Sequence, residues 1–241
     1  MKPIESLKRL LARTRADNKL LVSFLLLAAA LFVFLKLASE VREGEVFGID
    51  RWLIQALRSP DDPAVPLGPA WLRHALTDVT SLGGFTVLTL LTIVVAGYLI
   101  AARKGAMAIF LILSISTGAI ASSLLKLFFA RARPDLVAHL VEASSTSFPS
   151  GHAMNSAIVY LTLGALLARA ESNRAVRVYL MTIAVFLTLL VGFSRVYLGV
   201  HWPSDVLAGW CVGAAWAVLC SWLAGRLQRR RTIEPEGKAD R

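Results

Sequence analysis

The chain has 241 residues, of which 56% are hydrophobic, and it carries a formal net charge of +10 at pH 7. A soluble domain of this length rarely contains so much apolar residue, so the composition favours a membrane protein with several spans. In a soluble protein the basic excess would indicate nucleic-acid binding. Here we expect no nucleic-acid partner, because the distribution of the charge has a better explanation.

Six apolar stretches approach the length of about 20 mostly apolar residues that one crossing of a bilayer requires. The first follows a basic segment, and we expect a retained signal anchor because no clear small-residue cleavage site follows Lys36. The fifth is the shortest and could extend past Ser194 toward Tyr197. The expected fold is therefore all-α, a six-transmembrane-helix bundle forming a single domain over residues 1–241. The stretches are roughly Leu20–Leu37, Leu82–Ala102, Ala106–Phe128, His152–Ala168, Val178–Phe193 and Val206–Leu223.

Lys and Arg residues are concentrated in every second connection. Seventeen of the 26 lie on one side of the membrane if the six spans alternate, and the other side keeps nine Lys or Arg against ten Asp or Glu. Cytoplasmic loops carry the basic excess, so we expect both termini in the cytoplasm and the protein in the inner (plasma) membrane. The C-terminal basic residues would lie against anionic headgroups. The basic groups are residues 1–19, Arg103–Lys104, Arg169 with Arg174 and Arg177, and residues 226–241.

Residues 39–81 form the long connection between the first two expected spans. Within it, residues 46–57 alternate apolar and polar groups at helical spacing, which predicts an interfacial helical segment. Residues 59–63 and 66–69 are rich in Pro, Asp and Gly and are typical of turns. Two roles remain open for the segment: a connector that caps the bundle, or a lid or ramp for an incoming lipid.

Basic residues follow the third expected span, in the segment from Lys126 to Arg133 and Pro134. A lysine is a point charge for a phosphate oxygen, whereas an arginine offers a bidentate fork. If the helix continued that far, Lys126 and Arg133 would lie about two turns apart, and Pro134 would stop or kink the chain. For Arg131 we expect only a basic residue that snorkels at the membrane edge.

The segment Pro149-Ser150-Gly151-His152 precedes the fourth expected span. Ser150 is a good N-cap, and Gly151 lets the backbone approach a ligand closely. The N-terminus of a helix presents free N–H groups and the positive end of the helix dipole, so it binds anions. Taken alone, the segment fits a capped helix start with an interfacial histidine equally well.

The segment from His201 to Asp205 opens the sixth expected span, and Pro203 suits its first turn. Asp205 can accept a hydrogen bond from one imidazole nitrogen of His201, which leaves the other nitrogen free as a nucleophile or base. The plainer alternative is an interfacial histidine beside an Asp N-cap. Trp202 looks like a residue of the membrane interface and needs no catalytic role.

Two histidines and an aspartate could also be metal ligands. However, the expected topology brings Lys126, Arg133 and Arg195 to the same face of the membrane, where they would repel a divalent cation. They would attract a phosphoryl transition state, whose charge is spread over its equatorial oxygens. The residues therefore predict a phosphate site with no metal and no cofactor, but they do not decide which histidine attacks.

The patterns Lys-x6-Arg-Pro, Pro-Ser-Gly-His and Ser-Arg-x5-His-x3-Asp, in this order, resemble the three-part signature of the type 2 phosphatidic acid phosphatase superfamily. The six spans and residues 78–83, which enter span two, also look like bacterial membrane lipid phosphatases of the phosphatidylglycerophosphatase B and undecaprenyl-pyrophosphate phosphatase type. The resemblance implies that His201 attacks phosphorus, that Asp205 orients it, and that His152 protonates the leaving oxygen. It further implies phosphate binding by Lys126, Arg133, Arg195, Ser150 and Gly151.

We therefore expect a lipid phosphate phosphatase whose site faces outward, toward the periplasm in a Gram-negative cell. The expected partners are the bilayer and a lipid phosphate: phosphatidic acid, phosphatidylglycerol phosphate or undecaprenyl pyrophosphate. A lipid A phosphatase or a lipid phosphotransferase would use the same site. A transporter that binds a lipid phosphate without cleaving it would not need the two histidines. The sequence leaves the oligomeric state open.

Overall fold

The structure, a computed structural model, describes residues 2–44, 47–143 and 145–233, with side chains from Leu21 onward. Residues 234–241 of the expected basic tail therefore lie outside the described residues. The described chain is helical and contains no strand. Its helices are α1 (Lys2–Arg42), α2 (Gly48–Ala56), α3 (Ala70–Ser81), α4 (Phe85–Ala101), α5 (Gly105–Phe129), α6 (Gly151–Ser156), the π-helical turn η1 (Ala157–Leu161), α7 (Thr162–Ala170), α8 (Arg174–Tyr197) and α9 (Pro203–Arg229).

By length and composition the described residues contain five helices that could span a membrane, and a sixth if the bent pair α3 and α4 counts as one span. Five are single runs of helix: Leu21–Arg42 within α1, then α5, the continuous α6–η1–α7 run, α8 and α9. The sixth is the pair α3 and α4, which bends by 50° at a short break. The helices extend beyond the apolar stretches, and α8 continues past Ser194 to Tyr197 as expected.

Helix α3 is the element that the sequence did not predict. It begins directly after Pro69 and turns Leu76 and Thr80 inward. The chain then breaks before α4 and passes close to two other helices at Gly83. A Cβ at this position would collide with the Val191 side chain of α8 and would lie 3.3 Å from the backbone oxygen of His152. The bend is therefore held against the beginning of α6.

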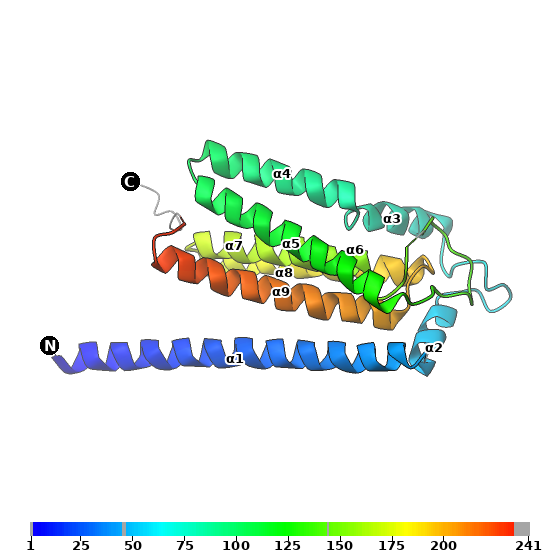
Figure 1. The fold of residues 1–241 in the computed structure, drawn as a ribbon, viewed down its shortest axis with the longest axis horizontal. Coiled ribbons are helices and arrows are strands. Elements are labelled where there is room, and N and C mark those ends of the chain that lie inside the picture. Colours follow the sequence, from blue (N-terminus) through cyan, green and yellow to red (C-terminus); the bar gives the residue numbers. More distant parts are fainter. Residues whose placement is uncertain (1, 45–46, 144, 234–241) are drawn as a thin grey trace.

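The helices α6 and α9, which carry the two histidine motifs, lie in backbone contact. A Cβ at Gly209 of α9 would lie 2.8 Å from the backbone oxygen of Ser150, and one at Gly213 would lie 2.5 Å from the Cβ of Ala157. Glycine at these two positions therefore allows the close approach. On its other side α9 packs against α1, which runs along it (Figure 1).

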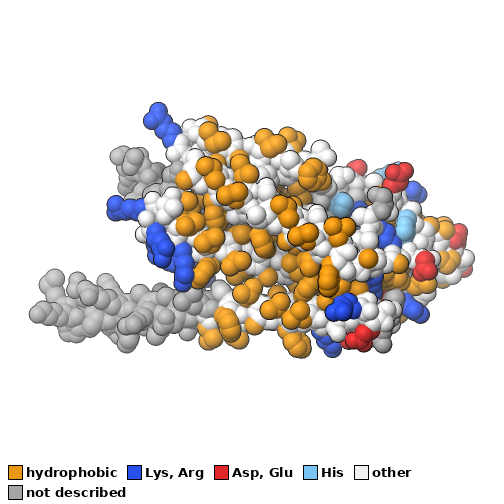
Figure 2. Space-filling model, in the orientation of Figure 1, with side chains coloured by type: hydrophobic (Ala, Val, Ile, Leu, Met, Phe, Trp, Pro, Cys, Tyr) orange, Lys and Arg blue, Asp and Glu red, His pale blue; other side chains and the backbone are white. Residues whose placement is uncertain are grey.

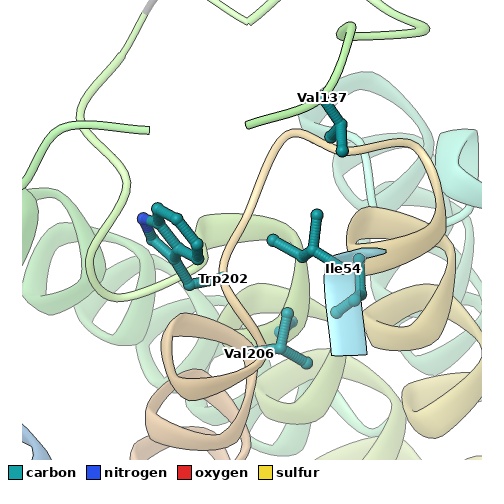
Figure 3. Close-up of a cluster of buried hydrophobic side chains, with 6 residues drawn as sticks. Ile54, Val137, Trp202 and Val206 are labelled. Atoms are coloured by element: carbon teal, nitrogen blue, oxygen red, sulfur yellow. The ribbon is translucent and has the colours of Figure 1, made fainter. Parts of the chain in front are cut away.

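The short helix α2 caps the end of the bundle at which α9 begins. Its residue Ile54 is fully buried and packs with Val137, Trp202 and Val206 (Figure 3). On its other side Trp52 remains 63% exposed. Of the two roles left open for residues 39–81, this packing favours the connector that caps the bundle.

The two ends of the molecule differ in charge. In the view of Figure 2, apolar side chains cover the middle of the helical body, and the charged side chains visible at the end away from α2 are basic. At the α2 end, acidic, basic and histidine side chains occur together. The long connections, from α1 to α3 and from α5 to α6, also lie at this end (Figure 1).

Candidate active site

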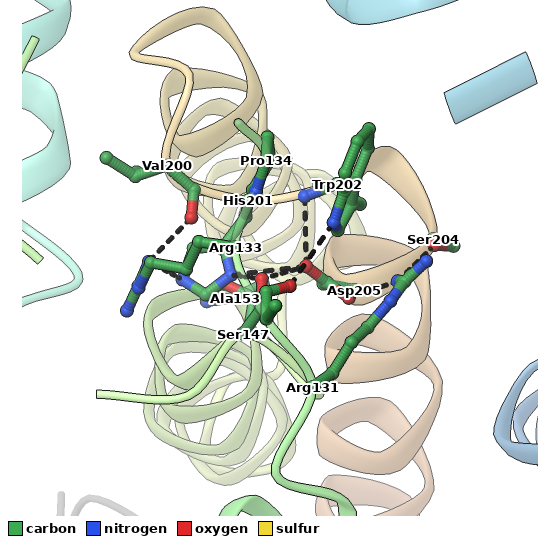
Figure 4. A network of polar contacts seen from close by, with 12 residues as sticks. Arg131, Arg133, Pro134, Ser147, Ala153, Val200, His201, Trp202, Ser204 and Asp205 are labelled. Atoms are coloured by element: carbon green, nitrogen blue, oxygen red, sulfur yellow. Dashed lines mark hydrogen bonds and ion pairs between the residues drawn. The ribbon is translucent and has the colours of Figure 1, made fainter. Parts of the chain in front are cut away.

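His201 and Asp205 face each other at the beginning of α9, as the four-residue spacing predicts. Nδ1 of His201 lies 3.5 Å from Oδ2 of Asp205, and neither side chain is more than 1% exposed. The helix start fixes the carboxylate, because its Oδ2 also accepts a hydrogen bond of 2.9 Å from the backbone N–H of Trp202. One ring nitrogen of His201, Nδ1, thus faces the carboxylate, and both residues belong to the polar network drawn in Figure 4.

Ser147, which the sequence analysis did not single out, contacts both members of this pair. Its hydroxyl donates a short hydrogen bond to Oδ2 of Asp205 and lies 3.3 Å from Nδ1 of His201. The side chain is fully buried. The serine therefore helps to hold the carboxylate and the imidazole in one arrangement.

Arg133 and Lys126 lie on the other side of His201, as expected, but a loop and not a continued helix carries Arg133 there. The helix does not continue to Arg133: α5 ends at Phe129, and Ala130 adopts a left-handed conformation with a φ of 46°. The loop then returns Arg133 to the site, where its Nη1 lies 3.3 Å from Nε2 of His201 and donates to the backbone oxygen of Val200 at 2.5 Å.

The two cations share one partner, Ser145. Nζ of Lys126 donates to the Ser145 hydroxyl at 3.0 Å, and Nε of Arg133 donates to the Ser145 backbone oxygen at 2.7 Å. Lys126 also lies against the start of α6, where a Cβ at Gly151 would come within 3.0 Å of its Cε. The absence of a side chain at Gly151 thus gives the ammonium group room beside the helix N-terminus.

Ser150 is the N-cap of α6, as predicted. Its hydroxyl accepts a hydrogen bond of 3.5 Å from the backbone N–H of Ala153. Its own N–H donates to the backbone oxygen of Asp205 at 2.9 Å. Ser150 is fully buried, so its clearest role in the structure is to tie the start of α6 to the start of α9.

His152 and Arg195 line a pocket of about 370 Å³. The bend between α3 and α4 forms another wall of it, through Ser81 and residues 84–87. Nη1 of Arg195 donates to the Thr80 hydroxyl at 3.0 Å, which fixes the guanidinium group at this wall. His152 lies within electrostatic reach of Lys126, Arg133, Arg195 and His201. One cation and one histidine of the site, Arg195 and His152, therefore face this pocket.

The interpretation of Arg131 as a snorkelling residue is wrong. Its side chain is only 8% exposed, and it lies between two buried carboxylates. Nη1 lies 2.5 Å from Oδ1 of Asp205, and Nη2 lies 3.4 Å from Oδ2 of Asp50 on α2. The guanidinium carbon also lies 5.6 Å from the centre of the Trp202 ring. The opposed carboxylates hold this arginine inside the protein rather than at the membrane edge.

Burial shifts the pKa of three residues at this end of the bundle. Desolvation lowers the pKa of His201 to about 4, although the hydrogen bond and the charge of Asp205 act in the opposite direction. Burial also lowers the pKa of Arg133, and it raises the pKa of Asp50 against the opposing effects of Ser204 and Arg131. At neutral pH His201 is therefore a neutral imidazole, as a nitrogen nucleophile must be.

The supporting residues that sequence reasoning missed share two properties: they lie in loops or at helix ends, and their partners are distant in the chain. For Ser145 and Ser147 the one available signal was the run of hydroxyl residues before Pro149. These residues are Asp50, Thr80, Ser145, Ser147 and Ser204.

Comparison with known proteins identifies relatives of this chain. The family model of the PAP2 superfamily matches residues 107–229. Phosphatidylglycerophosphatase B of Bacillus subtilis (strain 168) is 36% identical over 183 residues, which is 75% of this chain and 85% of the relative. An undecaprenyl-diphosphatase of Sulfolobus acidocaldarius is 37% identical over 78 residues, which is 32% of this chain and 34% of that one.

The fold agrees as well. The crystal structure of a transmembrane PAP2-type phosphatidylglycerolphosphate phosphatase from Bacillus subtilis superposes with a TM-score of 0.73 at 29% identity, covering 84% of this chain and 98% of that one. The matched residues include both histidine motifs and the three cations of the site. This chain therefore belongs to the PAP2 superfamily and is a multi-pass membrane phosphatase.

Proposed function

We propose that the protein removes a phosphate group from a membrane lipid, either a phosphomonoester or a diphosphate, through a phosphohistidine on His201. One observation carries the proposal: Nδ1 of His201 faces Asp205, while Nε2 faces Arg133 at 3.3 Å. A nucleophilic nitrogen is thus directed to the place where a guanidinium group would bind phosphate oxygens. The names of the relatives support phosphatidylglycerol phosphate and undecaprenyl diphosphate as substrates, and phosphatidic acid carries the same type of phosphate ester.

In the first step, the lone pair on Nε2 of His201 forms the N–P bond as the bond from phosphorus to the leaving oxygen breaks. The leaving oxygen is the ester oxygen of the lipid in a phosphomonoester and the bridging oxygen in a diphosphate. The leaving oxygen takes a proton from His152. Asp205 stabilises the positive charge that develops on the His201 ring. The charge on the transferring phosphoryl oxygens is stabilised by Lys126, Arg133 and Arg195.

In the second step, His152 takes a proton from a water molecule, whose oxygen attacks phosphorus. The N–P bond breaks, inorganic phosphate leaves, and its departure restores the neutral imidazole of His201. Each histidine thus returns to its starting protonation state. The cations remain in place through both steps, so the protein need not rearrange its charges during turnover.

The proposal also includes an orientation in the inner membrane. The end away from α2 carries basic side chains, which favours a cytoplasmic position for that end and for both termini. The site would then lie at the outer headgroup level. A lipid phosphate could bind there while its hydrocarbon chains remain in the bilayer.

The decisive experiment is the variant His201→Ala, assayed in detergent for phosphate release from a short-chain phosphatidic acid. We expect no turnover and no phosphorylated enzyme, with His74→Ala as the matched control because His74 is exposed on α3. A thermal melt would show that the variant is folded. Retained turnover would contradict the assigned nucleophile, and strict dependence on added Mg²⁺ or Zn²⁺ after EDTA treatment would contradict the metal-free mechanism.

A further inference from the structure

Asp50 is a fully buried carboxylate that the proposed chemistry does not use. It lies on α2, in the connection between the first two spans, but its partners lie at the start of α9. Oδ1 accepts a hydrogen bond of 2.8 Å from the backbone N–H of Ser204, and Oδ2 accepts one of 2.5 Å from the Ser204 hydroxyl. Burying a charged group costs free energy unless it is paired, so such a residue requires an explanation.

Arg131 connects Asp50 to the proposed catalytic pair. Its guanidinium group contacts Oδ2 of Asp50 at 3.4 Å and Oδ1 of Asp205 at 2.5 Å. It also donates to the Ser204 hydroxyl at 2.9 Å. Since Oδ2 of Asp205 is the atom that faces His201, the three charged groups and the imidazole form one continuous network of contacts.

The net charge of these four groups favours a positive charge on the His201 ring. Two carboxylates, one guanidinium group and a neutral imidazole carry one net negative charge. A phosphohistidine ring with a positive charge would bring the sum to zero. If Asp50 were uncharged, Arg131 would already neutralise Asp205, and the same intermediate would leave these four buried groups with a sum of one positive charge. Such a charge is costly at low local dielectric.

We infer that Asp50 is a positioning residue for this site: it neutralises Arg131, so that the negative charge of Asp205 remains available to His201. The inference rests on the proposed function, because it assumes that His201 is the nucleophile. It gives α2 a role beyond capping the bundle. The helix brings to the site the carboxylate that balances the arginine, and Ile54 fixes it there.

The first test is Asp50→Asn, which keeps the size of the side chain and an oxygen that can accept from Ser204. We expect a fall in kcat on the order of tenfold to a hundredfold, because the site loses charge balance and alignment. KM for a short-chain phosphatidic acid should be nearly unchanged, since Asp50 lies behind Asp205 and not among the phosphate-binding cations. The matched control is Asp61→Asn, an exposed carboxylate in the same connection, for which kcat should equal that of the wild type.

The double variant Asp50→Asn with Arg131→Gln separates a charge effect from a structural one. It removes the carboxylate and the guanidinium group together, and so restores the net negative charge of Asp205. We expect its kcat, and its rate of phosphoenzyme formation, to exceed those of Asp50→Asn alone. A double variant that is as slow as the single variant or slower would show that Asp50 has only a structural role, and would overturn the inference.

The variants His201→Ala and Asp50→Asn together distinguish a failure of this inference from a failure of the proposed function. If His201→Ala retains turnover, the nucleophile is wrong and the inference falls with it. If His201→Ala is inactive but Asp50→Asn has the kcat of the wild type, only the inference fails. Thermal melts of the detergent-solubilised variants would identify any loss of folding, and the comparison of double with single variant remains valid for all variants that fold.

Discussion

His201 and Asp205 lie one helical turn apart, with Nδ1 and Oδ2 separated by 3.5 Å, and both are buried. The relationship depends on how α9 begins. Trp202 is its N-cap and Pro203 its first residue, and the Asp205 carboxylate caps the backbone N–H of Trp202. The same carboxylate that caps the start of the helix thus faces the imidazole, and contacts from Ser147 and Arg131, which lie outside the helix, hold this carboxylate in place.

Asp205→Asn should lower kcat by about a hundredfold to ten-thousandfold, because an amide neither fixes the imidazole tautomer nor balances a positive ring. KM should change little, since the phosphate-binding cations remain in place. The measurement is steady-state phosphate release in detergent, together with a thermal melt. A variant with the kcat of the wild type would show that the carboxylate contributes only to the helix cap.

Ser147→Ala should lower kcat by roughly tenfold, which corresponds to about 1.4 kcal/mol, the scale of one buried hydrogen bond. The hydroxyl donates to Asp205, and without it the carboxylate loses one of the groups that hold it toward His201. The control is Ser123→Ala, whose exposed hydroxyl bonds only within its own helix at 3.1 Å. An equal effect of both substitutions would show that Ser147 has no specific role.

Ser147 and Asp50 show which parts of the structure could not be predicted from the sequence. The six spans follow from apolar length, and the pairing of His201 with Asp205 follows from spacing within a single helical turn. Ser147 and Asp50 reach the same atoms from a loop and from another helix, through contacts that no local periodicity encodes. The burial of Arg131 could not be predicted for the same reason, because it depends on two carboxylates that lie far from it in the chain.

The acid limb of kcat/KM should lie near pH 4, well below the ordinary range for histidine. Burial lowers the pKa of His201 to about 4, and protonation removes the lone pair that attacks phosphorus. Activity should therefore be present above this pKa and lost as the pH falls through it. Burial raises the pKa of Asp50, so Asp50 could also titrate in this range. Measuring the Asp50→Asn variant together with the wild type separates the titration of Asp50 from that of His201. A limb near pH 6.5 in both proteins would contradict the assignment.

Gly209→Ala should inactivate the protein or lower its thermal stability. The added Cβ would lie 2.8 Å from the backbone oxygen of Ser150 and 3.0 Å from the backbone nitrogen of Met154, so α6 would have to move away from α9. The movement would separate the two histidine motifs. Gly97→Ala on α4 is the matched control, since nothing lies within 4 Å of its Cβ position. This control should keep its activity, and it should be stabilised by up to about 1 kcal/mol because alanine favours the helix.

The proposed orientation can be tested with two single cysteine substitutions at exposed loop positions. Asp135→Cys lies in the connection from α5 to α6, at the site end, and Ser172→Cys lies between α7 and α8 at the opposite end. A membrane-impermeant thiol reagent added to intact cells should label the first and not the second, and both after the cells are broken. The wild type is the blank, because Cys220 is buried and Cys211 half-buried within α9. Labelling of Ser172→Cys alone in intact cells would place the site on the cytoplasmic side.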